Sequence, residues 1–489
     1  MKSLPLFLIF VCALLASCLN EEGYTTSADA RLRLERDTLA LDTVLAGEAT
    51  NTYTFQVFNP QKKTLRIAAI RLAGGAKSPF MVNVDGTFLA NGVTGATELA
   101  GGDSLRVFVQ LNAPASTATS PTPLEDRLLF LLENGAEQQV LLTASTQSVI
   151  NLRGARVERD TTWNAPRPYR ILDSLVVEEG RTLTLSAGTR LYFHPAARLI
   201  VHGTLRAEGQ NGAPVEFRGD RLGYMFSNQP YDRIPGQWGG VVFTAKSRDN
   251  VLDHCEIHSG DFGIRCDSSS VDFQKLILRN SLIHNVGGDG LYARQCAVNV
   301  GNSQITNAAG DCVRLVGGRN EFVHCTIGQF YALAGDRGVA LHFSNYGEGS
   351  RAPLERASFV NCIISGYNND DLMRESSKRY KNDAFNYDFS HCLLNTPKPT
   401  TDEHFRNCLF EQDSPEARRQ AGNFSPSFDL QKLLFVFTLD AKSAAVGKAD
   451  FAVTQQTFPF DRNGKSQTKG GKSDMGCYRH VRSEERRVG

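Results

Sequence analysis

The sequence predicts an all-β protein with two modules, a β-sandwich followed by a β-solenoid of parallel strands. Three observations support this prediction. Apolar and polar residues alternate in short segments of the first third of the chain. Short apolar segments separated by glycines then follow without helices, and a six-residue pattern recurs seven times beyond residue 250. A chain of 489 residues is also long enough for more than one domain.

Composition excludes several classes of protein. Lys and Arg total 53 and Asp and Glu total 52, so no basic surface for nucleic acid and no acidic tail is expected. Hydrophobic residues make up 41% and charged residues 21%, which is a globular profile. We therefore exclude a nucleic-acid packer, a multi-span membrane protein and a disordered scaffold.

The N-terminus carries an export signal. Lys2 precedes an apolar run over 4–15, which is too short to span a bilayer and has the length of a signal-peptide core. The run ends in Leu-Ala-Ser-Cys at 15–18, which resembles the bacterial lipobox. The resemblance implies a signal peptide over 1–17, lipidation of Cys18 and an anchor and linker over 18–29. The alternative is a plain secretory signal with an incidental cysteine.

A lipidated Cys18 predicts a location at the outer membrane or cell surface, with the lipid anchor as the sole membrane contact. Glu21 and Glu22 follow directly and resemble the surface-export signals of Bacteroidetes lipoproteins.

Residues 30–148 form the predicted sandwich. Strand patterns cover 53–57, 65–67, 105–109 and 140–142, and turn residues separate them. The order of segments 55–59, 65–67, 80–82 and 102–104 resembles immunoglobulin-like domains of the ASH/Hydin type. These are binding or spacer modules. We assign this domain no chemistry, because it shows no cluster of His, Cys or paired carboxylates.

We expect a linker over 149–170 and the solenoid from 171. Its repeated pattern places Asn or His, then Cys or Ser, between apolar residues. The Cys or Ser positions are Cys255, Ser281, Ser303, Cys325, Cys362, Cys392 and Cys408, separated by 26, 22, 22, 37, 30 and 16 residues. Asn or His at a corner tolerates a left-handed backbone, and the small residue after it turns inward. Because these cysteines fall one per coil and form no C-x-x-C pair, we expect them to be buried packing residues rather than metal ligands.

Residues 171–410 resemble the right-handed, single-stranded parallel β-helix of pectate-lyase-like proteins. Asp-Arg-Asn-Gly at 461–464 and Asp-Met-Gly-Cys-Tyr at 474–478 resemble the closing motif of bacterial β-helix proteins. The resemblance implies a β-helix with a C-terminal cap over 171–480. We treat 481–489 as a non-native or disordered tail.

A second repeated feature, the dipeptide Gly-Asp, marks a candidate binding face. Gly-Asp pairs end at Asp261, Asp289, Asp311 and Asp336, each before a short strand. In these strands we expect Ile264, Leu291, Val313 and Val339 to point inward. The residues expected to point outward are Arg265, Tyr292, Arg314, Ala340, Asp267, Arg294 and His342. The alternative is that each Asp has only a structural role, in which its side chain caps the turn at a corner of the solenoid.

This mixture of side chains would suit an acidic glycan. The predicted catalytic residues are Asp289, Asp311, Arg314 and His342, and the predicted binding residues on this face are Arg265, Tyr292, Arg294 and Asp336. Calcium is the one cofactor that such an aspartate cluster suggests, although no metal ligands are assigned. The family comparison supplies no catalytic set, because the G-H-G and R-I-K signatures of polygalacturonases are missing and Arg351 and Arg356 do not match the lyase spacing.

Two inserted loops, 223–237 and 368–381, carry aromatic and charged residues. Tyr231 and the adjacent Trp238 are predicted to stack on sugars, or alternatively to cover the solenoid's apolar edge.

The leading function is a surface protein that binds a polysaccharide or another extracellular partner. The alternatives are a polysaccharide lyase or glycoside hydrolase for an acidic glycan, and an adhesin-like structural protein. The sequence predicts no oligomeric state.

Overall fold

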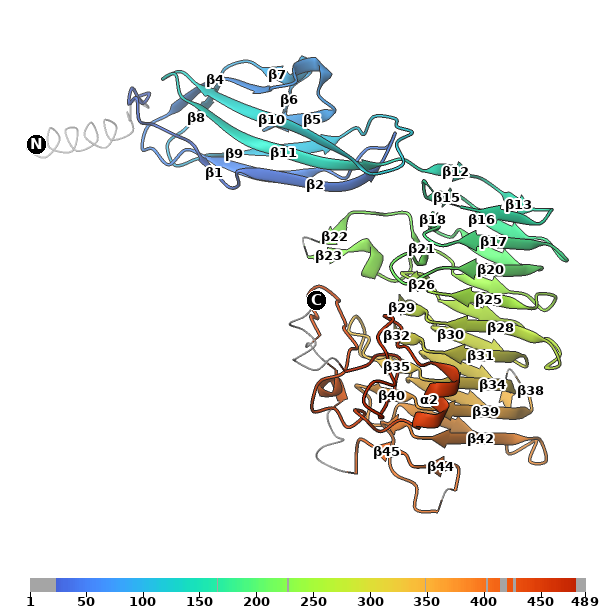
Figure 1. The fold of residues 1–489 in the computed structure, drawn as a ribbon. Helices are drawn as coiled ribbons and strands as arrows, with labels where there is room; N and C mark the ends of the chain where they lie inside the picture. The colour runs from blue at the N-terminus through green and yellow to red at the C-terminus, as the bar shows by residue number, and fades with distance from the viewer. Residues whose placement is uncertain are drawn as a thin grey trace, which may run out of the picture. The chain divides into compact units, whose positions relative to one another are not determined.

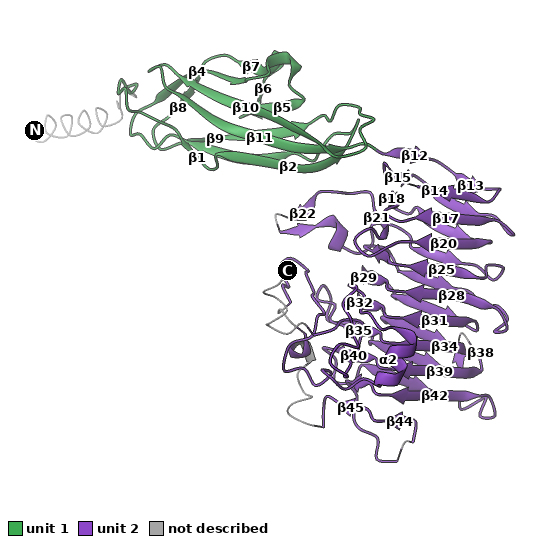
Figure 2. Ribbon diagram, viewed as in Figure 1, with its two compact units in different colours: residues 1–148 green, residues 149–489 purple. Residues whose placement is uncertain are grey.

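The computed structural model describes residues 23–164, 166–226, 228–347, 349–401, 403–413, 420–424 and 428–480. The predicted signal peptide, Cys18 and the tail 481–489 therefore lie outside the described residues. The chain divides into two compact units, Met1–Ser148 and Val149–Gly489 (Figure 2).

Unit 1 is a sandwich of two sheets around one apolar core. One sheet has the order β1 (Arg33–Leu34), β3 (Tyr53–Phe58), β9 (Ser104–Leu111), β5 (Phe80–Val84), β6 (Thr87–Phe88). The other has the order β2 (Thr38–Leu45), β11 (Glu137–Gln147), β10 (Thr122–Leu132), β4 (Leu65–Leu72), β7 (Val93–Thr94), with β8 (Thr97–Leu99) also on β4. Turns η1 (Gly75–Lys77) and η2 (Ala90–Gly92) complete it. Alternate residues such as Phe55, Val107 and Phe130 fill the core, so the predicted sandwich is confirmed.

Unit 2 is a right-handed parallel β-helix in which each coil up to β42 adds one strand to each of three sheets (Figure 1). The last strands, β43 to β45, extend only the first and third sheets. The first sheet contains β12 (Ile150–Leu152), β15 (Tyr169–Ile171), β18 (Arg190–Phe193), β21 (Val215–Gly219), β26 (Cys255–His258), β29 (Leu282–Val286), β32 (Gln304–Ala308), β35 (Thr326–Gln329), β40 (Ile363–Gly366), β43 (Leu393–Leu394) and β45 (Leu409–Phe410).

The second and third sheets complete the coils. The second contains β13 (Ala155–Val157), β16 (Ser174–Val177), β19 (Arg198–Val201), β24 (Val241–Phe243), β27 (Ile264–Cys266), β30 (Leu291–Arg294), β33 (Val313–Val316), β36 (Leu341–Ser344) and β41 (Leu372–Glu375). The third contains β14 (Thr161–Trp163), β17 (Thr182–Ser186), β20 (Thr204–Glu208), β25 (Asn250–Asp253), β28 (Gln274–Arg279), β31 (Ala297–Gly301), β34 (Gly318–Val323), β39 (Leu354–Val360), β42 (Phe385–Ser390) and β44 (Phe405–Arg406).

The β-helix begins earlier than predicted. Residues 149–170, expected to be a linker, contain β12, β13 and β14, which pair in parallel with β15, β16 and β17. These first strands have three residues each, so they are too short to show a period in the sequence. The next coil supplies the hydrogen-bond partners that make them strands.

The repeated corner pattern is confirmed at every predicted position. The Asn or His before each Cys or Ser has a positive φ of 48–57°, at His254, Asn280, Asn302, His324, Asn361, His391 and Asn407. The next residue points inward. In the following examples its side chain accepts the backbone N–H of the equivalent residue one coil earlier. The Cys255 N–H donates to Ser281 Oγ at 3.0 Å, and the Cys362 N–H donates to Cys392 Sγ at 3.4 Å. Cys255, Cys325, Cys362 and Cys392 are buried, whereas Cys408 in the last coil is partly exposed.

The C-terminal part runs along the side of the β-helix. We call residues 428–480 the closing segment. Its Phe437, Met475 and Tyr478 pack against Phe330 and Ile363, which face outward at the first sheet. The predicted cap is thus a lateral cover of that sheet, because apolar side chains on its outer face need burial. Residues 420–480 also include η4 (Gln420–Asn423) and the helix α2 (Phe451–Thr457).

Two small hairpins project from the coils. They are β22 (Tyr224–Phe226) with β23 (Gln229–Pro230), and β37 (Tyr346–Gly347) with β38 (Ser350–Arg351). The turn η3 (Tyr231–Arg233) follows the first hairpin. Among the described residues, none forms a helix of the length and hydropathy needed to cross a membrane.

Replacing Asn302 by Ala should destabilise unit 2 more than replacing it by Gly. Both variants lose the bonds from Asn302 Nδ2 to Asn280 Oδ1 (2.8 Å) and Phe460 O (3.1 Å). Only Ala is strained at a φ of 49°. That strain is about 1–2 kcal/mol and exceeds the entropic cost of Gly, about 0.4–1 kcal/mol, so Ala should be the less stable by roughly 0.5–1 kcal/mol. Urea unfolding of both variants measures the difference, and equal stability would contradict the left-handed corner.

Candidate functional site

The outer face of the second sheet carries a row of polar side chains in register. Arg265 on β27 pairs with Tyr292 on β30, Tyr292 with Arg314 on β33, and Arg314 with His342 on β36. The Arg265 guanidinium lies 5.8 Å from the centroid of the Tyr292 ring. Arg265 and Arg314 are exposed, Tyr292 is half-buried and His342 is 9% exposed. We call these four residues the polar row. All four were predicted for this face.

The register of the fourth coil differs from the prediction. Val313 pairs with Leu341, so Leu341 points inward instead of Val339, and Ala340 is buried rather than exposed. His342 consequently lies beside Arg314, not two residues further along the strand. The cause is the insertion between β35 and β36, which displaces the Gly335-Asp336 pair from the corner.

Only Asp289 and Asp311 occupy equivalent Gly-Asp corners. Asp289 Oδ1 accepts the N–H of Asp311 at 2.8 Å, and Asp311 Oδ1 accepts the N–H of Val339 at 2.9 Å. Each aspartate therefore hydrogen-bonds its corner to the next coil, which supports the alternative of a structural role at the corner. Asp336, predicted to bind, is exposed in the insertion away from these corners.

His342 lies between two carboxylates. Its Nδ1 is 2.9 Å from Asp311 Oδ2 and its Nε2 is 3.1 Å from Glu375 Oε2. Burial lowers the pKa of His342, but the hydrogen bond and charge of Asp311 and the bond to Glu375 outweigh it, so the pKa is raised. Sequence reasoning missed Glu375, because no Gly-Asp pair marks its coil.

Arg314 acts on this group electrostatically. The pKa of Asp289 is raised, because the effect of burial is larger than the opposing effects of the Asp311 N–H and of the positive charge of Arg314. The four predicted catalytic residues are thus neighbours. Both oxygens of Asp311 and both nitrogens of His342 already have partners within the protein. This arrangement holds the His342 ring in place, and Arg314 is the exposed member of the group.

The described residues do not fit a calcium site on this face. One oxygen of Asp289 and both oxygens of Asp311 are already bonded to groups of the protein, which leaves few oxygens for a cation that prefers about six to eight of them. No group of three or more His, Cys, Asp or Glu side chains in the described part of the chain is arranged to hold a metal ion.

Trp238 was predicted wrongly as a surface residue. It is fully buried, its ring stacks on Phe193 at 4.3 Å, and its Nε1–H donates to His258 O at 2.8 Å. The glycines that follow it turn the chain into β24, which directs the large ring into the core. Two other predicted binding residues contact neighbouring side chains. Tyr231 is the first residue of η3, and the Arg221 guanidinium lies over its ring, 5.0 Å from the centroid. Arg294 donates to Ser350 Oγ at 2.9 Å.

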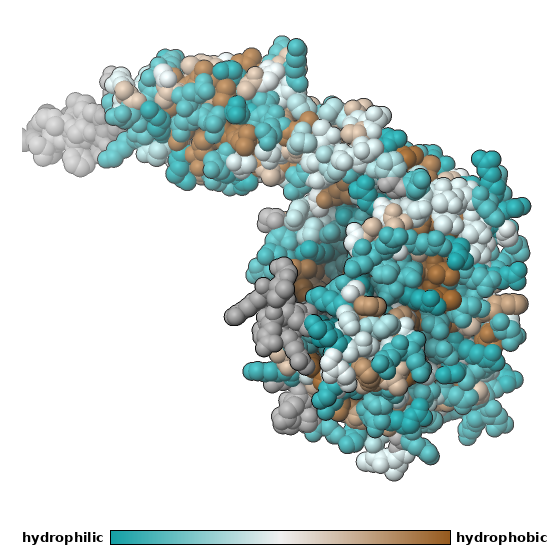
Figure 3. Space-filling model, in the orientation of Figure 1, coloured by the Kyte–Doolittle hydropathy of each residue, from teal (hydrophilic) through white to brown (hydrophobic). Residues whose placement is uncertain are grey.

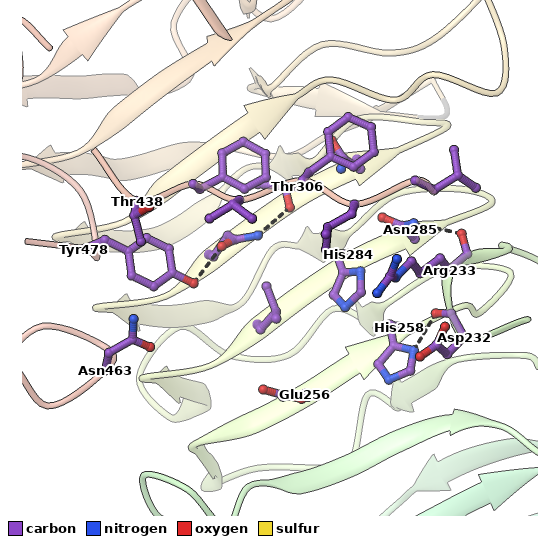
Figure 4. Close-up of a pocket in the computed structure, with 18 of the residues that line it drawn as sticks. Asp232, Arg233, Glu256, His258, His284, Asn285, Thr306, Thr438, Asn463 and Tyr478 are labelled. Carbon is purple, nitrogen blue, oxygen red and sulfur yellow. Dashed lines mark hydrogen bonds between the residues drawn. The ribbon is translucent and has the colours of Figure 1, made fainter. Parts of the chain in front are cut away.

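A cavity that sequence reasoning did not find lies on the first sheet (Figure 4). It has a volume of about 370 Å³. Its walls are the outer face of β26, β29 and β32, the turn η3 and residues 433–438 of the closing segment. Figure 3 shows that the face of unit 2 around the closing segment is mainly hydrophilic. The cavity was missed because its walls are up to about 260 residues apart in sequence, from Glu216 to Tyr478.

Two histidines dominate the β-strand wall of the cavity. The rings of His258 and His284 stack with centroids 5.0 Å apart. His258 Nδ1 lies 2.8 Å from Asp232 O. Burial, together with the charge of His258, lowers the pKa of His284 to about 3, so this ring is neutral at physiological pH.

Residues 225–327 match the family model described as "Right handed beta helix region". The match covers the coils from β22 to β35 and agrees with the architecture. The N-terminal part is similar to a solved structure, the ASH/PapD-like domain 7 of human CEP192, at 12% identity over 25% of this chain and 89% of that domain, with a TM-score of 0.17. No curated protein matches the chain.

The His342 cluster should make stability depend on pH. Because the pKa of folded His342 is raised above its ordinary 6.5, its contribution is fully present below that value and is lost as the pH rises through the raised pKa. The unfolding free energy of the wild type relative to His342→Gln should therefore be largest near pH 5 and shrink towards pH 9. Urea titrations at several pH values measure it. A difference of constant size would show that the imidazolium is not stabilised.

Proposed function

We propose that the protein is a lipid-anchored cell-surface protein that binds an extended glycan along the outer face of its second sheet. The observation that carries this proposal is the polar row, in which Arg265, Tyr292, Arg314 and His342 stand in register on four successive coils. Adjacent strands are about 4.8 Å apart, so the row presents regularly spaced groups to a linear polymer.

The chemistry of the row suits a carbohydrate with acidic groups. Guanidinium groups donate paired hydrogen bonds to carboxylates and hydroxyls, and the tyrosine ring offers a flat surface for a sugar. His342, held between Asp311 and Glu375, closes the row with both of its ring nitrogens bonded inside the protein. The sandwich would act as the spacer between the anchor and this face.

Binding is favoured over catalysis by the contacts of the acidic residues. Asp311 and His342 bond to each other, and their other polar atoms bond to the Val339 N–H and to Glu375, which supports a role in holding the face rather than in proton transfer. A lyase or hydrolase on an acidic polysaccharide remains the competing function, and turnover separates the two.

Arg314→Ala should weaken retention of the protein in an affinity gel that contains the bound acidic polysaccharide. Losing one charged hydrogen-bonding group costs about 1.5–3 kcal/mol, so the dissociation constant should rise by roughly tenfold or more. Affinity electrophoresis over a panel of acidic and neutral polysaccharides, with and without calcium, measures it. Arg319→Ala is the matched control, because Arg319 is an exposed arginine on the third sheet paired with Glu355.

Three results would contradict the proposal. Equal losses for both arginine variants would exclude the second sheet as the binding face. New reducing ends or unsaturated uronides would favour the enzyme. Absence of both binding and cleavage across the panel would favour the adhesin.

Cys18→Ser should release the protein from the membrane. The thiol at residue 18 is the acceptor of the proposed lipid, and acyl chains supply all of the membrane affinity. In detergent phase partitioning of expressing cells, the wild type should enter the detergent phase and the variant the aqueous phase. Cys12→Ser is the control inside the same leader, and an unchanged partition of Cys18→Ser would exclude the lipid anchor.

A further inference from the structure

The cavity on the first sheet has one polar wall and one apolar wall. The polar wall comes from outward-facing side chains of β26, β29 and β32, among them His258, His284 and Thr306 (Figure 4). Opposite it lie Leu434, Phe435 and Phe437 of the closing segment. Small-molecule sites commonly combine such apolar surface with a few placed polar groups in about 300–1,000 Å³. The volume of about 370 Å³ falls in that range.

Two acceptor atoms at the cavity have no hydrogen-bond partner among the described residues. Asn307 is 2% exposed, and its Oδ1 is unpaired. Asp232 Oδ1, from η3, is likewise buried and unpaired. Both residues line the cavity. A buried acceptor without a donor is costly, and most such atoms in native proteins are paired, so these two oxygens need donors that the described residues do not supply.

Other groups on the polar wall can both donate and accept. Thr306 Oγ1 accepts from Gln304 Nε2 at 2.9 Å, which leaves its hydroxyl hydrogen to be donated. Tyr478 holds Gln304 in place by donating to its Oε1 at 2.7 Å. Neutral His284 has one N–H and one acceptor nitrogen. Alternating donors and acceptors of this kind match hydroxyl groups.

The carboxylates at the cavity are compensated within the protein. Glu256 pairs with Arg462 at 3.0 Å. Glu216 lies 3.6 Å from His258 and 3.8 Å from Arg218, and Asp232 Oδ2 also lies 3.8 Å from Arg218. Each of these carboxylates thus has a positively charged or titratable partner within 4 Å, and the lining Arg233 donates to Lys432 O at 3.0 Å.

We propose that this cavity binds a neutral saccharide unit. Its hydroxyls would donate to Asn307 Oδ1 and Asp232 Oδ1 and would bond Thr306 and His284, while a C–H face of the ring packs on Phe435 and Leu434. This site lies on the first sheet and is separate from the polar row, so it stands or falls independently of the proposed function.

The test titrates the purified protein with glucose, galactose, mannose and N-acetylglucosamine, using saturation-transfer NMR and calorimetry. Glucuronate and glucosamine serve as charged comparisons. We expect binding of at least one neutral sugar. Asn307→Gly should weaken it by roughly tenfold, because it removes the unpaired acceptor while glycine accepts the φ of 57°. Asn407→Gly is the matched control, an exposed corner at a φ of 53° in the last coil, and should bind as the wild type does.

A second variant guards against a folding defect in Asn307→Gly. Thr306→Val keeps the strand preference of residue 306 and removes its hydroxyl, so it should also weaken binding several-fold. Because buried Gln304 Nε2 loses its acceptor, the melting temperature of this variant should fall, and binding is measured well below the onset of unfolding. Arg314→Ala should leave sugar affinity unchanged, which separates this site from the polar row. The proposal is overturned if none of the four neutral sugars binds, if the charged comparisons bind more tightly, or if both cavity variants retain wild-type affinity.

Discussion

The left-handed corner between the third and first sheets is the constraint on which the rest of unit 2 depends. Asn or His adopts a positive φ there in seven coils. The side chains of Ser281, Ser303, Cys362 and Cys392 accept a backbone N–H from the preceding coil. Because side chains alternate across a strand, a slip of one residue would exchange the inner and outer faces. The corner excludes that slip and so determines which residues reach the surface.

The polar row is a consequence of this register. Four side chains from segments of unrelated sequence, separated by 22 to 28 residues, lie side by side only because their strands pair in parallel. Its geometry then decides its chemistry. The corner aspartates bond to neighbouring coils and Asp311 and Glu375 hold His342, so the groups that face solvent are arginine and tyrosine. The proposed binding of a polymer rests on these solvent-facing groups.

The closing segment gives the other face a different character. It covers apolar residues of the first sheet near Phe330 and Ile363. Further along it crosses polar side chains, and there a partly open cavity lies between the segment and the sheet instead of a packed core. Its attachment uses the corner ladder itself, since the Asp450 N–H at the start of α2 donates to Asn361 Oδ1 at 2.6 Å. One set of corner residues thus aligns the coils and anchors the cover.

The sequence alone determined the all-β class, the sandwich, the β-helix and the burial of four of its five corner cysteines, because these follow from local periodicity and from a repeated corner motif. It also predicted that Arg265, Tyr292, Arg314 and His342 share one face. Only the tertiary structure decided that β12 to β14 form a first coil, that the insertion before β36 shifts Ala340 inward, that Trp238 is core, and that Glu375 completes the histidine cluster. The cavity belongs to this second group as well. Each of these depends on contacts between residues distant in the chain, and such pairings leave no local pattern for sequence reasoning to find.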